Sequence, residues 1–182
     1  MNRLQTKYNE VIRNELKTEL GIANVHQIPK IEKIVINSGV GKAVADSKHL
    51  DSAVATLTKI SGQKPVITKA QHSIATFKLR EGMEIGTKVT LRGERMYSFL
   101  DRLIAVVIPR TRDFHGVSPK AFDKSGNYSL GFSDQTVFPE ISYEDASAIH
   151  GLQVTIVISG NNPTASRALL EKLGMPFEKG AK

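Results

Sequence analysis

Cysteine and tryptophan are both absent from this sequence of 182 residues, and aromatic residues make up only 6% of it. Without cysteine the chain cannot form disulfides, bind zinc through thiolates or use a cysteine nucleophile. The same absence fits a reducing, cytoplasmic location. The scarcity of aromatic rings disfavours recognition of single-stranded nucleic acid, because that mode needs exposed rings on which bases stack.

Long hydrophobic runs are also missing. No apolar stretch approaches the roughly 20 residues that a membrane span needs, and the N-terminal segment is charged and amphipathic, so neither a span nor a secretory signal is expected. The composition, 40% hydrophobic and 24% charged, is ordinary for a globular protein. A chain of this length suits one large domain or two small ones.

The sequence lacks a recognisable catalytic or metal-binding arrangement. Its five histidines are widely spaced and form no HxH or HxxxH pair: His26, His49, His72, His115 and His150. Glu140, Glu144 and Asp145 could act as acid and base, but they are equally typical of a solvated acidic loop. No serine occupies a nucleophile-elbow pattern. We therefore expect no enzyme activity, no small-molecule substrate, no metal and no cofactor.

Positive charge is concentrated in one part of the chain. The net charge is +7, and the segment from Lys59 to Arg112 holds eleven lysine and arginine residues against four acidic ones, a surplus of seven. The remaining residues carry fourteen charges of each sign. This distribution favours a polyanionic partner. An anionic membrane would account for the charge equally well, but the segment shows no basic amphipathic helix with a bulky apolar face, so we expect no membrane partner.

Helical periodicity and strand alternation predict an α+β fold. Amphipathic helices are predicted over residues 3–20, from Asp46 or Ser47 to Gly62, over residues 94–107 with Pro109 beyond the end, and from Pro163 to Leu173. Strands are predicted between Pro29 and Gly39 and over residues 66–70, 87–92, 128–132 and 152–158. This order indicates a single domain spanning residues 1–182, with a mostly antiparallel sheet and helices packed on its apolar face.

A long connection separates two of these strands. Residues Gln71 to Gly86 mix basic, small and apolar side chains without a clean period, and the segment is too long for a tight hairpin turn. Connections of this kind are usually functional or mobile. We expect a long mobile loop between two central strands.

The strand that follows Pro29 has one apolar and one polar face. Ile34 and Ile36 share one side, because side chains alternate across a sheet. The other side carries, in order, Ile31, Lys33, Val35 and Asn37. A lysine and an amide therefore stand where a buried face would hold leucine or isoleucine. Taken alone, this pattern is as typical of a half-exposed strand with solvated residues as of a binding surface.

The strand over residues 87–92 repeats the pattern. Val89 and Leu91 point to one side, and the other side carries Lys88, Thr90 and Arg92. Lysine and arginine contact phosphates, whereas short amides and hydroxyls such as those of Asn37, Gln63 and Thr90 reach 2′-hydroxyl groups and base edges. The exposed face of the sheet is therefore predicted to bind folded RNA.

A glycine-rich turn, Gly39-Val40-Gly41-Lys42, follows the first strand. A nucleotide-binding P-loop would need glycine and Ser or Thr at positions that hold Ile36 and Ala43, and the third glycine of a dinucleotide fingerprint is missing. The turn is interpreted as a tight strand-to-helix connection, with close approach to an RNA backbone as the open alternative. Two competing hypotheses remain: an enzyme that uses this turn on a nucleotide, and a binder of nucleic acid or membrane that acts by charge alone.

Five motifs, in order along the chain, resemble one family. They are Pro29–Gly41 (PKIEKIVINSGVG), Leu57–Ala70 (LTKISGQKPVITKA), Arg110–Gly116 (RTRDFHG), Phe138–Ile141 (FPEI) and Leu173–Phe177 (LGMPF). The second is close to a signature of that family. The chain thus resembles the bacterial form of universal large-subunit ribosomal protein five, a family that binds 5S rRNA in the central protuberance.

The resemblance implies a structural, non-enzymatic role in the large subunit of the cytoplasmic ribosome, with 5S rRNA on the exposed face and edges of the sheet. The family's binding positions correspond here to Lys33, Asn37, Gln63 and Thr90, with Phe77 nearby. Strand alternation adds Lys88 and Arg92 as rRNA-binding residues.

The resemblance also implies further partners. The loop from about His72 to Glu84 would reach the peptidyl-site tRNA through Phe77, Lys78 and Arg80. The region from Arg110 to Gly116, including Arg112, and the acidic residues 134–146 would face the small subunit and touch its ribosomal protein thirteen. A further expected partner is 23S rRNA.

The sequence departs from the family pattern at two positions. His115 stands where an arginine is common, which would weaken one charge contact. Ser38 replaces a frequent methionine, with little expected effect.

Overall fold

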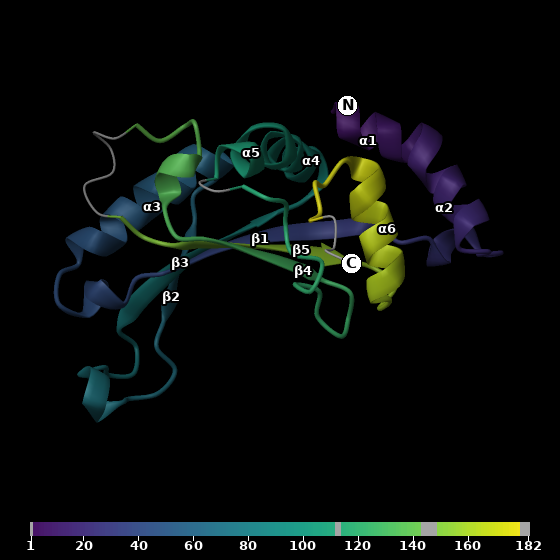
Figure 1. Ribbon diagram of the computed structural model, residues 1–182. Coiled ribbons are helices and arrows are strands. Elements are labelled where there is room, and N and C mark those ends of the chain that lie inside the picture. The colour runs from purple at the N-terminus through teal and green to yellow at the C-terminus, as the bar shows by residue number, and fades with distance from the viewer. Residues whose placement is uncertain (1, 112–113, 143–148, 179–182) are drawn as a thin grey trace. The chain divides into compact units, whose positions relative to one another are not determined.

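The computed structural model describes residues 2–111, 114–142 and 149–178 and confirms the predicted α+β fold (Figure 1). Its strands are β1 (Ile31–Gly39), β2 (Val66–Lys69), β3 (Glu84–Leu91), β4 (Tyr128–Phe132) and β5 (Leu152–Ile158). They form one sheet in the order β2-β3-β1-β5-β4. The strand nearest the N-terminus, β1, therefore lies in the centre of the sheet, and β2 and β4 form its edges.

The helices occupy the predicted parts of the chain. They are α1 (Arg3–Lys7), α2 (Arg13–Glu19), α3 (Lys48–Ser61), α4 (Gly93–Arg102), α5 (Ile108–Arg110) and α6 (Pro163–Leu173). The π-helical turn Tyr8–Ile12 joins α1 to α2, and a second one, Leu103–Val107, joins α4 to α5. The glycines after α3 and α6 adopt left-handed φ angles of 65° at Gly62 and 98° at Gly174, which confirms the predicted ends of these helices at Gly62 and Leu173.

Pro109 was predicted to lie beyond the end of a helix, and this prediction is wrong. The helical backbone continues through Pro109 to Arg110. In the preceding π-helical turn the Ile108 amide donates to the Leu103 carbonyl, so the hydrogen-bond pattern changes just before the proline. Pro109 then falls in the first turn of α5, where a missing N–H is tolerated.

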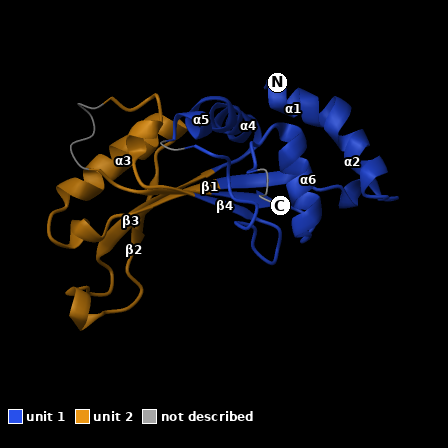
Figure 2. Ribbon diagram, in the orientation of Figure 1, with its two compact units in different colours: residues 1–34, 91–130, 155–182 blue, residues 35–90, 131–154 orange. Residues whose placement is uncertain are grey.

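The chain divides into two compact units, shown in Figure 2. Unit 1 comprises residues 1–34, 91–130 and 155–182, and unit 2 comprises residues 35–90 and 131–154. In unit 1, α1, α4 and α6 bury apolar side chains such as Leu4, Leu100 and Leu169. In unit 2, α3 covers one face of the strands and buries Leu50, Ala53, Leu57 and Ile60.

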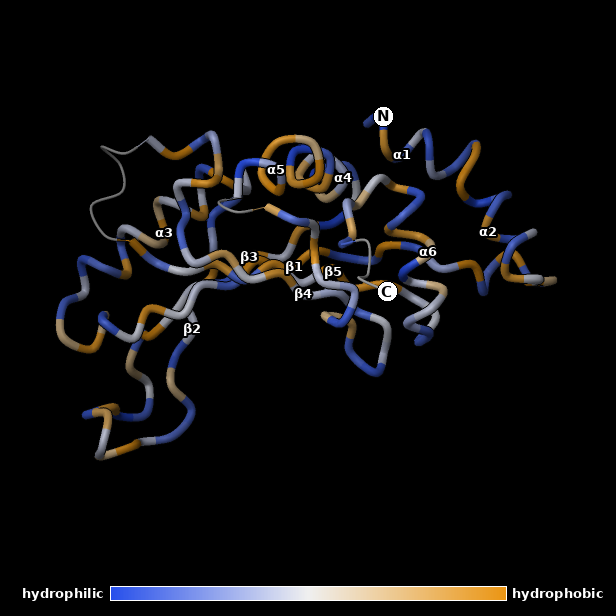
Figure 3. The backbone as a smooth tube through the Cα atoms, in the orientation of Figure 1, coloured by the Kyte–Doolittle hydropathy of each residue, from blue (hydrophilic) through white to orange (hydrophobic). Residues whose placement is uncertain are grey.

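The connection between β2 and β3 is more ordered than its composition indicates. The two strands pair antiparallel with Val66 opposite Lys88, and β3 begins at Glu84, three residues before the predicted start at Thr87. Beyond them the Ala70 amide donates to the Met83 carbonyl at 2.8 Å. Short hydrophilic and hydrophobic stretches alternate along this loop in Figure 3. Its mobility stays a prediction.

Candidate nucleic-acid interface

Strand β1 places its predicted side chains as alternation requires. Ile34 and Ile36 are fully buried, whereas Lys33 and Asn37 are half-buried on the opposite side of the strand. Ile31 is the exception, since it is buried although alternation assigns it to the side of Lys33. The polar face therefore begins at Lys33.

Strand β3 confirms the same pattern. Val89 and Leu91 are buried, with exposed fractions of 2% and 1%. Lys88 is exposed and Thr90 is half-buried. Arg92 follows the strand in an extended conformation and is exposed. In Figure 2, α3 lies over one face of the unit 2 strands, and alternation with the buried Val89 and Leu91 places Lys88 and Thr90 on the opposite, open face.

Gln63 is positioned by the end of α3. The Ser61 hydroxyl donates to the Leu57 carbonyl at 2.6 Å and accepts from the Gln63 backbone amide at 3.2 Å, which fixes the backbone beyond Gly62. Gln63 lies three residues before Val66, the register partner of Lys88. Gln63 is half-buried close to the start of β2.

The polar side chains of this face have no protein partner among the residues that the structure describes. The side-chain amides of Asn37 and Gln63 neither accept nor donate a hydrogen bond there, and Lys88 forms no ion pair. Neither amide is among the buried side-chain groups that lack a partner, so each can exchange its water for a ligand. By contrast, Lys69 on β2 lies 3.7 Å from a carboxylate oxygen of Glu84. The open groups are thus available to a ligand.

The two units divide the predicted rRNA-binding residues between them. Unit 2 holds Asn37, Gln63, Lys88 and Thr90, and unit 1 holds Lys33 and Arg92. The structure therefore brings the first four together within one compact unit. Neither Lys33 nor Arg92 forms an ion pair with a described residue.

The loop beyond β2 and β3 ends in a small folded tip. The amides and carbonyls of Ile74 and Leu79 bond each other in both directions, at 2.9 and 3.1 Å. Between them Lys78 adopts a left-handed φ of 53°, and Phe77 is 70% exposed. Lys78 and Arg80 are also exposed. The tip therefore presents an aromatic ring next to two cations.

The residues predicted to face the small subunit are only partly described. Arg110 ends α5 and is exposed, whereas Arg112 lies outside the described residues. In the acidic stretch, the Asp134 carboxylate accepts from the Thr136 amide at 2.8 Å and so caps a short turn. Glu144 and Asp145 also lie outside the described residues.

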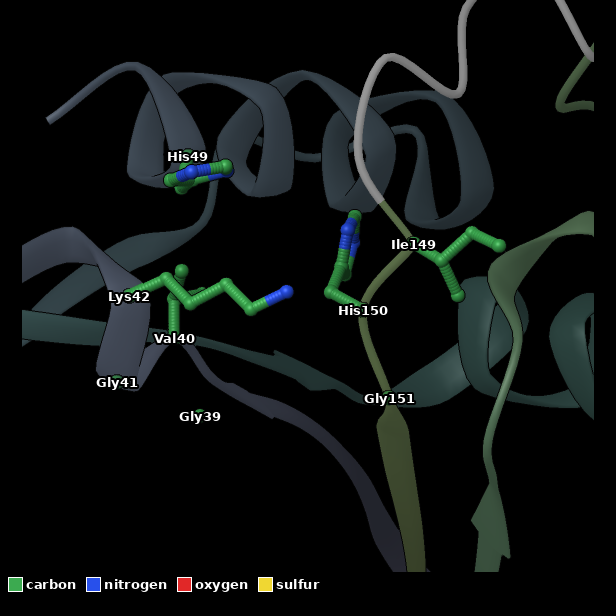
Figure 4. Close-up of a pocket in the computed structure, with 8 residues that line it drawn as sticks. All are labelled: Gly39, Val40, Gly41, Lys42, His49, Ile149, His150 and Gly151. Carbon is green, nitrogen blue, oxygen red and sulfur yellow. The ribbon is translucent and has the colours of Figure 1, made fainter. Parts of the chain in front are cut away.

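Two features were missed from the sequence. An added Cβ at Gly86 would lie 2.8 Å from the Ser38 carbonyl oxygen and 2.8 Å from the Thr68 hydroxyl, so this glycine permits close packing of the strands. A glycine inside a strand pattern is the signal that could have revealed it. The second feature is a cavity of about 430 Å³ in unit 2, lined by Gly39–Lys42, His49 and Ile149–Gly151 (Figure 4). The residues that line it are far apart in the sequence, so no sequence motif predicts the cavity.

In the described part of the chain, no three histidine or acidic side chains lie close enough together to hold a metal ion. None of the described helices is both long and apolar enough to cross a membrane.

Comparison with known proteins adds a family assignment to this geometry. Residues 24–80 match the family model of ribosomal protein L5, and residues 84–177 match the model of the C-terminus of the same ribosomal family. The chain is 56% identical over 178 residues to the large ribosomal subunit protein uL5 of Lactococcus lactis subsp. cremoris (strain MG1363), an alignment that covers 98% of this chain and 99% of the relative. It is 57% identical to the protein of the same name from Psychrobacter cryohalolentis, over 98% of this chain and 100% of the relative.

Proposed function

This chain belongs to the ribosomal protein L5 family and is a structural constituent of the large ribosomal subunit, and from that premise we propose that it binds 5S rRNA and helps attach it to the central protuberance. Its place of action is the cytoplasmic ribosome, and its relatives are ribosomal proteins rather than enzymes. We further propose that residues 1–182 act as one RNA-binding domain.

The observation that carries the proposal is the open face of unit 2. It presents two amides without a protein partner among the described residues, at Asn37 and Gln63, beside the unpaired cation of Lys88. Amides read 2′-hydroxyl groups and base edges, and lysine neutralises phosphate. Because the described residues assigned to this face offer donors and acceptors and include no aromatic side chain, the face fits a folded RNA better than an unstacked strand.

The remaining contacts are proposed from the positions of exposed side chains. Phe77, Lys78 and Arg80 at the loop tip would meet the peptidyl-site tRNA, with the ring stacking and the cations on phosphate. Arg110, together with Arg112, would contribute to a contact with ribosomal protein thirteen of the small subunit. A further proposed partner is 23S rRNA.

Substitution of Asn37 by alanine tests the proposal. We expect Asn37→Ala to weaken 5S rRNA binding about tenfold in a filter-binding assay, because one recognition hydrogen bond is lost. The fold should persist, since the Asn37 side chain has no partner among the described residues. Asn9→Ala, which removes an exposed amide from the N-terminal helix, is the matched control and should bind normally. Equal affinity of the two variants for 5S rRNA would contradict the site.

The two alternatives make different predictions. Calorimetry with ATP, GTP and NAD should give no saturable heat, whereas an enzyme that uses the Gly39–Lys42 turn on a nucleotide would give it. Competition between 5S rRNA and random duplex RNA at matched salt separates specific recognition from binding by charge alone, because charge alone predicts equal competition.

A further inference from the structure

The open face of unit 2 continues beyond β1 onto β5. In the sheet order β1 lies between β3 and β5, so Asn37 on β1 has β3, which carries Lys88, on one side and β5 on the other. On β5, Leu152 and Val154 are buried, with exposed fractions of 3% and 0%, and Gln153 between them is exposed. Alternation therefore places Gln153 on the open face.

Two hydrogen bonds show how β5 runs beside β1. The Ser38 hydroxyl donates to the Gly151 carbonyl at 2.8 Å, just before β5 begins. At the other end of the pair, the Ser159 amide donates to the Lys30 carbonyl at 2.9 Å. The end of β1 therefore meets the start of β5, and the two strands run antiparallel.

This arrangement makes Asn37 and Gln153 neighbours on the open face. Asn37 directly precedes Ser38 in β1, and Gln153 is the first open-face residue of β5 after Gly151. Side chains at such cross-strand positions are close enough to contact one ligand. Neither side-chain amide bonds to another described residue, so together they offer paired donors and acceptors.

Strand β4 runs along the far side of β5. The Ser129 and Thr155 hydroxyls lie 3.1 Å apart across β4 and β5, and Gly131 and Gln153 come two residues later and two residues earlier on these strands. An added Cβ at Gly151 would lie 3.3 Å from a backbone oxygen at the end of β4, so these strands are also antiparallel. Gly131 is therefore the residue of β4 that faces Gln153.

Neither packing nor conformation requires glycine at position 131. Gly131 is exposed and has no left-handed φ, and an added Cβ there would meet no atom within 4 Å. The missing side chain instead leaves the backbone of this edge strand open beside Gln153. A ligand that contacts Gln153 can therefore pass over Gly131 without obstruction.

The two sides of the open face differ in charge. Residues 35–90, which supply β2, most of β1 and most of β3, carry eight lysine and arginine residues against four acidic ones. Residues 131–154, which end β4 and begin β5, carry four acidic residues and neither lysine nor arginine. Lys88 is unpaired among the described residues, because Glu84, the acidic residue of β3, is paired with Lys69. Cations for phosphate are thus offered on the β2–β3 side and not on the β4–β5 side.

We propose that RNA lies on the open face of unit 2 in one orientation. A phosphate backbone follows Lys88 on the β2–β3 side, and 2′-hydroxyl groups and base edges meet the amides of Asn37 and Gln153. The wide, shallow minor groove of A-form RNA displays such groups between its phosphate strands, and an amide can both donate to and accept from them. Gln153 is then a further specificity-determining residue. The orientation rests on the proposed function, because it applies only if the face binds RNA.

The salt dependence of binding separates the two sides. Filter binding of 5S rRNA and of random duplex RNA is measured at several salt concentrations. Gln153→Ala should weaken 5S rRNA binding about tenfold and leave the slope of log K against log salt unchanged, because no phosphate contact is lost. Gln27→Ala, which removes an exposed amide from unit 1, is the matched control and should bind as the parent does. Urea unfolding should be the same for both variants.

Two further variants probe the same place on the face. Gln153→Lys adds a cation, which would tighten binding and raise the salt slope by about 0.7 to 0.9 if a phosphate lay there. We expect it to bind 5S rRNA no better than Gln153→Ala, because an ammonium group cannot accept a hydrogen bond. Gly131→Val places a branched side chain beside Gln153 and should also weaken binding about tenfold, whereas the fold should persist because valine suits a strand.

The outcomes distinguish the orientation from the proposed function. A loss of affinity in Gln153→Ala that is confined to 5S rRNA, at constant salt slope, supports the orientation. If Gln153→Ala binds as Gln27→Ala does, or if Gln153→Lys binds more tightly with a steeper slope, the orientation is overturned even where Asn37→Ala still weakens binding. If the parent shows no preference for 5S rRNA over random duplex, the proposed function and the orientation both fail.

Discussion

In unit 1 several charged side chains join helices to one another, whereas in unit 2 several are left without a partner among the described residues. Lys172 on α6 lies 2.9 Å from Glu15 and 3.0 Å from Glu19, and these contacts raise the pKa of its ammonium group, with the hydrogen bond to Glu15 the largest cause. Arg3 lies 2.7 Å from Asp101 in the same unit. In unit 2, Lys42 and Lys88 form no ion pair with any described residue.

Aromatic side chains show this division only in part. In unit 1, Phe122, Tyr128 and Phe177 pack together with ring centroids 4.7 to 6.0 Å apart. In unit 2, Phe132 and Phe138 also pack, 5.6 Å apart, but Phe77 is 70% exposed at the loop tip. Unit 1 therefore uses these residue types for its own packing, and unit 2 leaves examples of both open for a partner. The division is incomplete, since Lys33 and Arg92, for example, belong to unit 1 and are unpaired within the described residues.

The largest expected effects come from truncating the two cores. Leu169→Ala in unit 1 and Leu57→Ala in unit 2 each remove a side chain with no exposed surface and should lower the free energy of unfolding by about 2 to 5 kcal/mol. If residues 1–182 form one domain, urea unfolding of each variant should show one transition, shifted in both. Two transitions, of which each variant moves only one, would show that the units are separate domains.

Alkaline pH should lower the stability of unit 1, because two buried tyrosines would lose their protons. Burial raises the pKa of Tyr8 and of Tyr128 from 10.0 to about 12, and their hydroxyls donate to the carbonyls of Pro29 and Ser118. Because the folded pKa is raised, the stabilisation is complete below pH 10 and is lost as the pH rises toward 12, by at most about 2 to 3 kcal/mol for each tyrosine.

Urea unfolding at pH 9 and pH 11 measures this loss. The double variant Tyr8→Phe/Tyr128→Phe should be less stable than the parent at pH 9 but should lose less stability on going to pH 11. An equal loss in the two proteins would assign the alkaline sensitivity to other groups.

Two lysine substitutions that remove the same charge should differ in their effect on RNA binding, and this difference is smaller than the stability effects above. Lys88→Ala should weaken 5S rRNA binding about tenfold and lower the salt dependence, as the slope of log K against log salt, by about 0.7 to 0.9. Lys172→Ala removes the same charge from a lysine that is already paired, so it should leave RNA affinity nearly unchanged. Equal losses of affinity would show that net charge, and not the open face of unit 2, determines binding.

The alternation of side chains along single strands was enough to predict one part of the candidate site. The period of two residues in β1 and β3 places Lys33, Asn37, Lys88 and Thr90 opposite a buried face, and the structure confirms this alternation. Gln63 lies outside any strand, so alternation could not find it; its amide made it a candidate by residue type, and the family resemblance assigned it to the site. The helix ends at Gly62 and Gly174 were predictable because the left-handed conformation there favours glycine.

The features that the sequence did not predict depend on hydrogen bonds and contacts that form only in the folded chain. Pro109 continues a helix because of a π-helical turn that no local propensity predicts. Gly86 is required by neighbours on two other strands, Ser38 and Thr68, whose positions follow only from sheet topology. The cavity beside the Gly39–Lys42 turn joins residues about a hundred positions apart in the sequence, from Lys42 to His150, so it forms only after folding.

The most direct test of the open face as a recognition surface is the ratio of affinities for 5S rRNA and for random duplex RNA, measured for the parent and for Asn37→Ala/Gln63→Ala at one salt concentration. Both substitutions leave the charge unchanged, so binding to random duplex should persist. We predict that the double variant loses most of its preference for 5S rRNA, which brings the ratio close to one. An unchanged ratio, or equal losses for both RNAs, would contradict it.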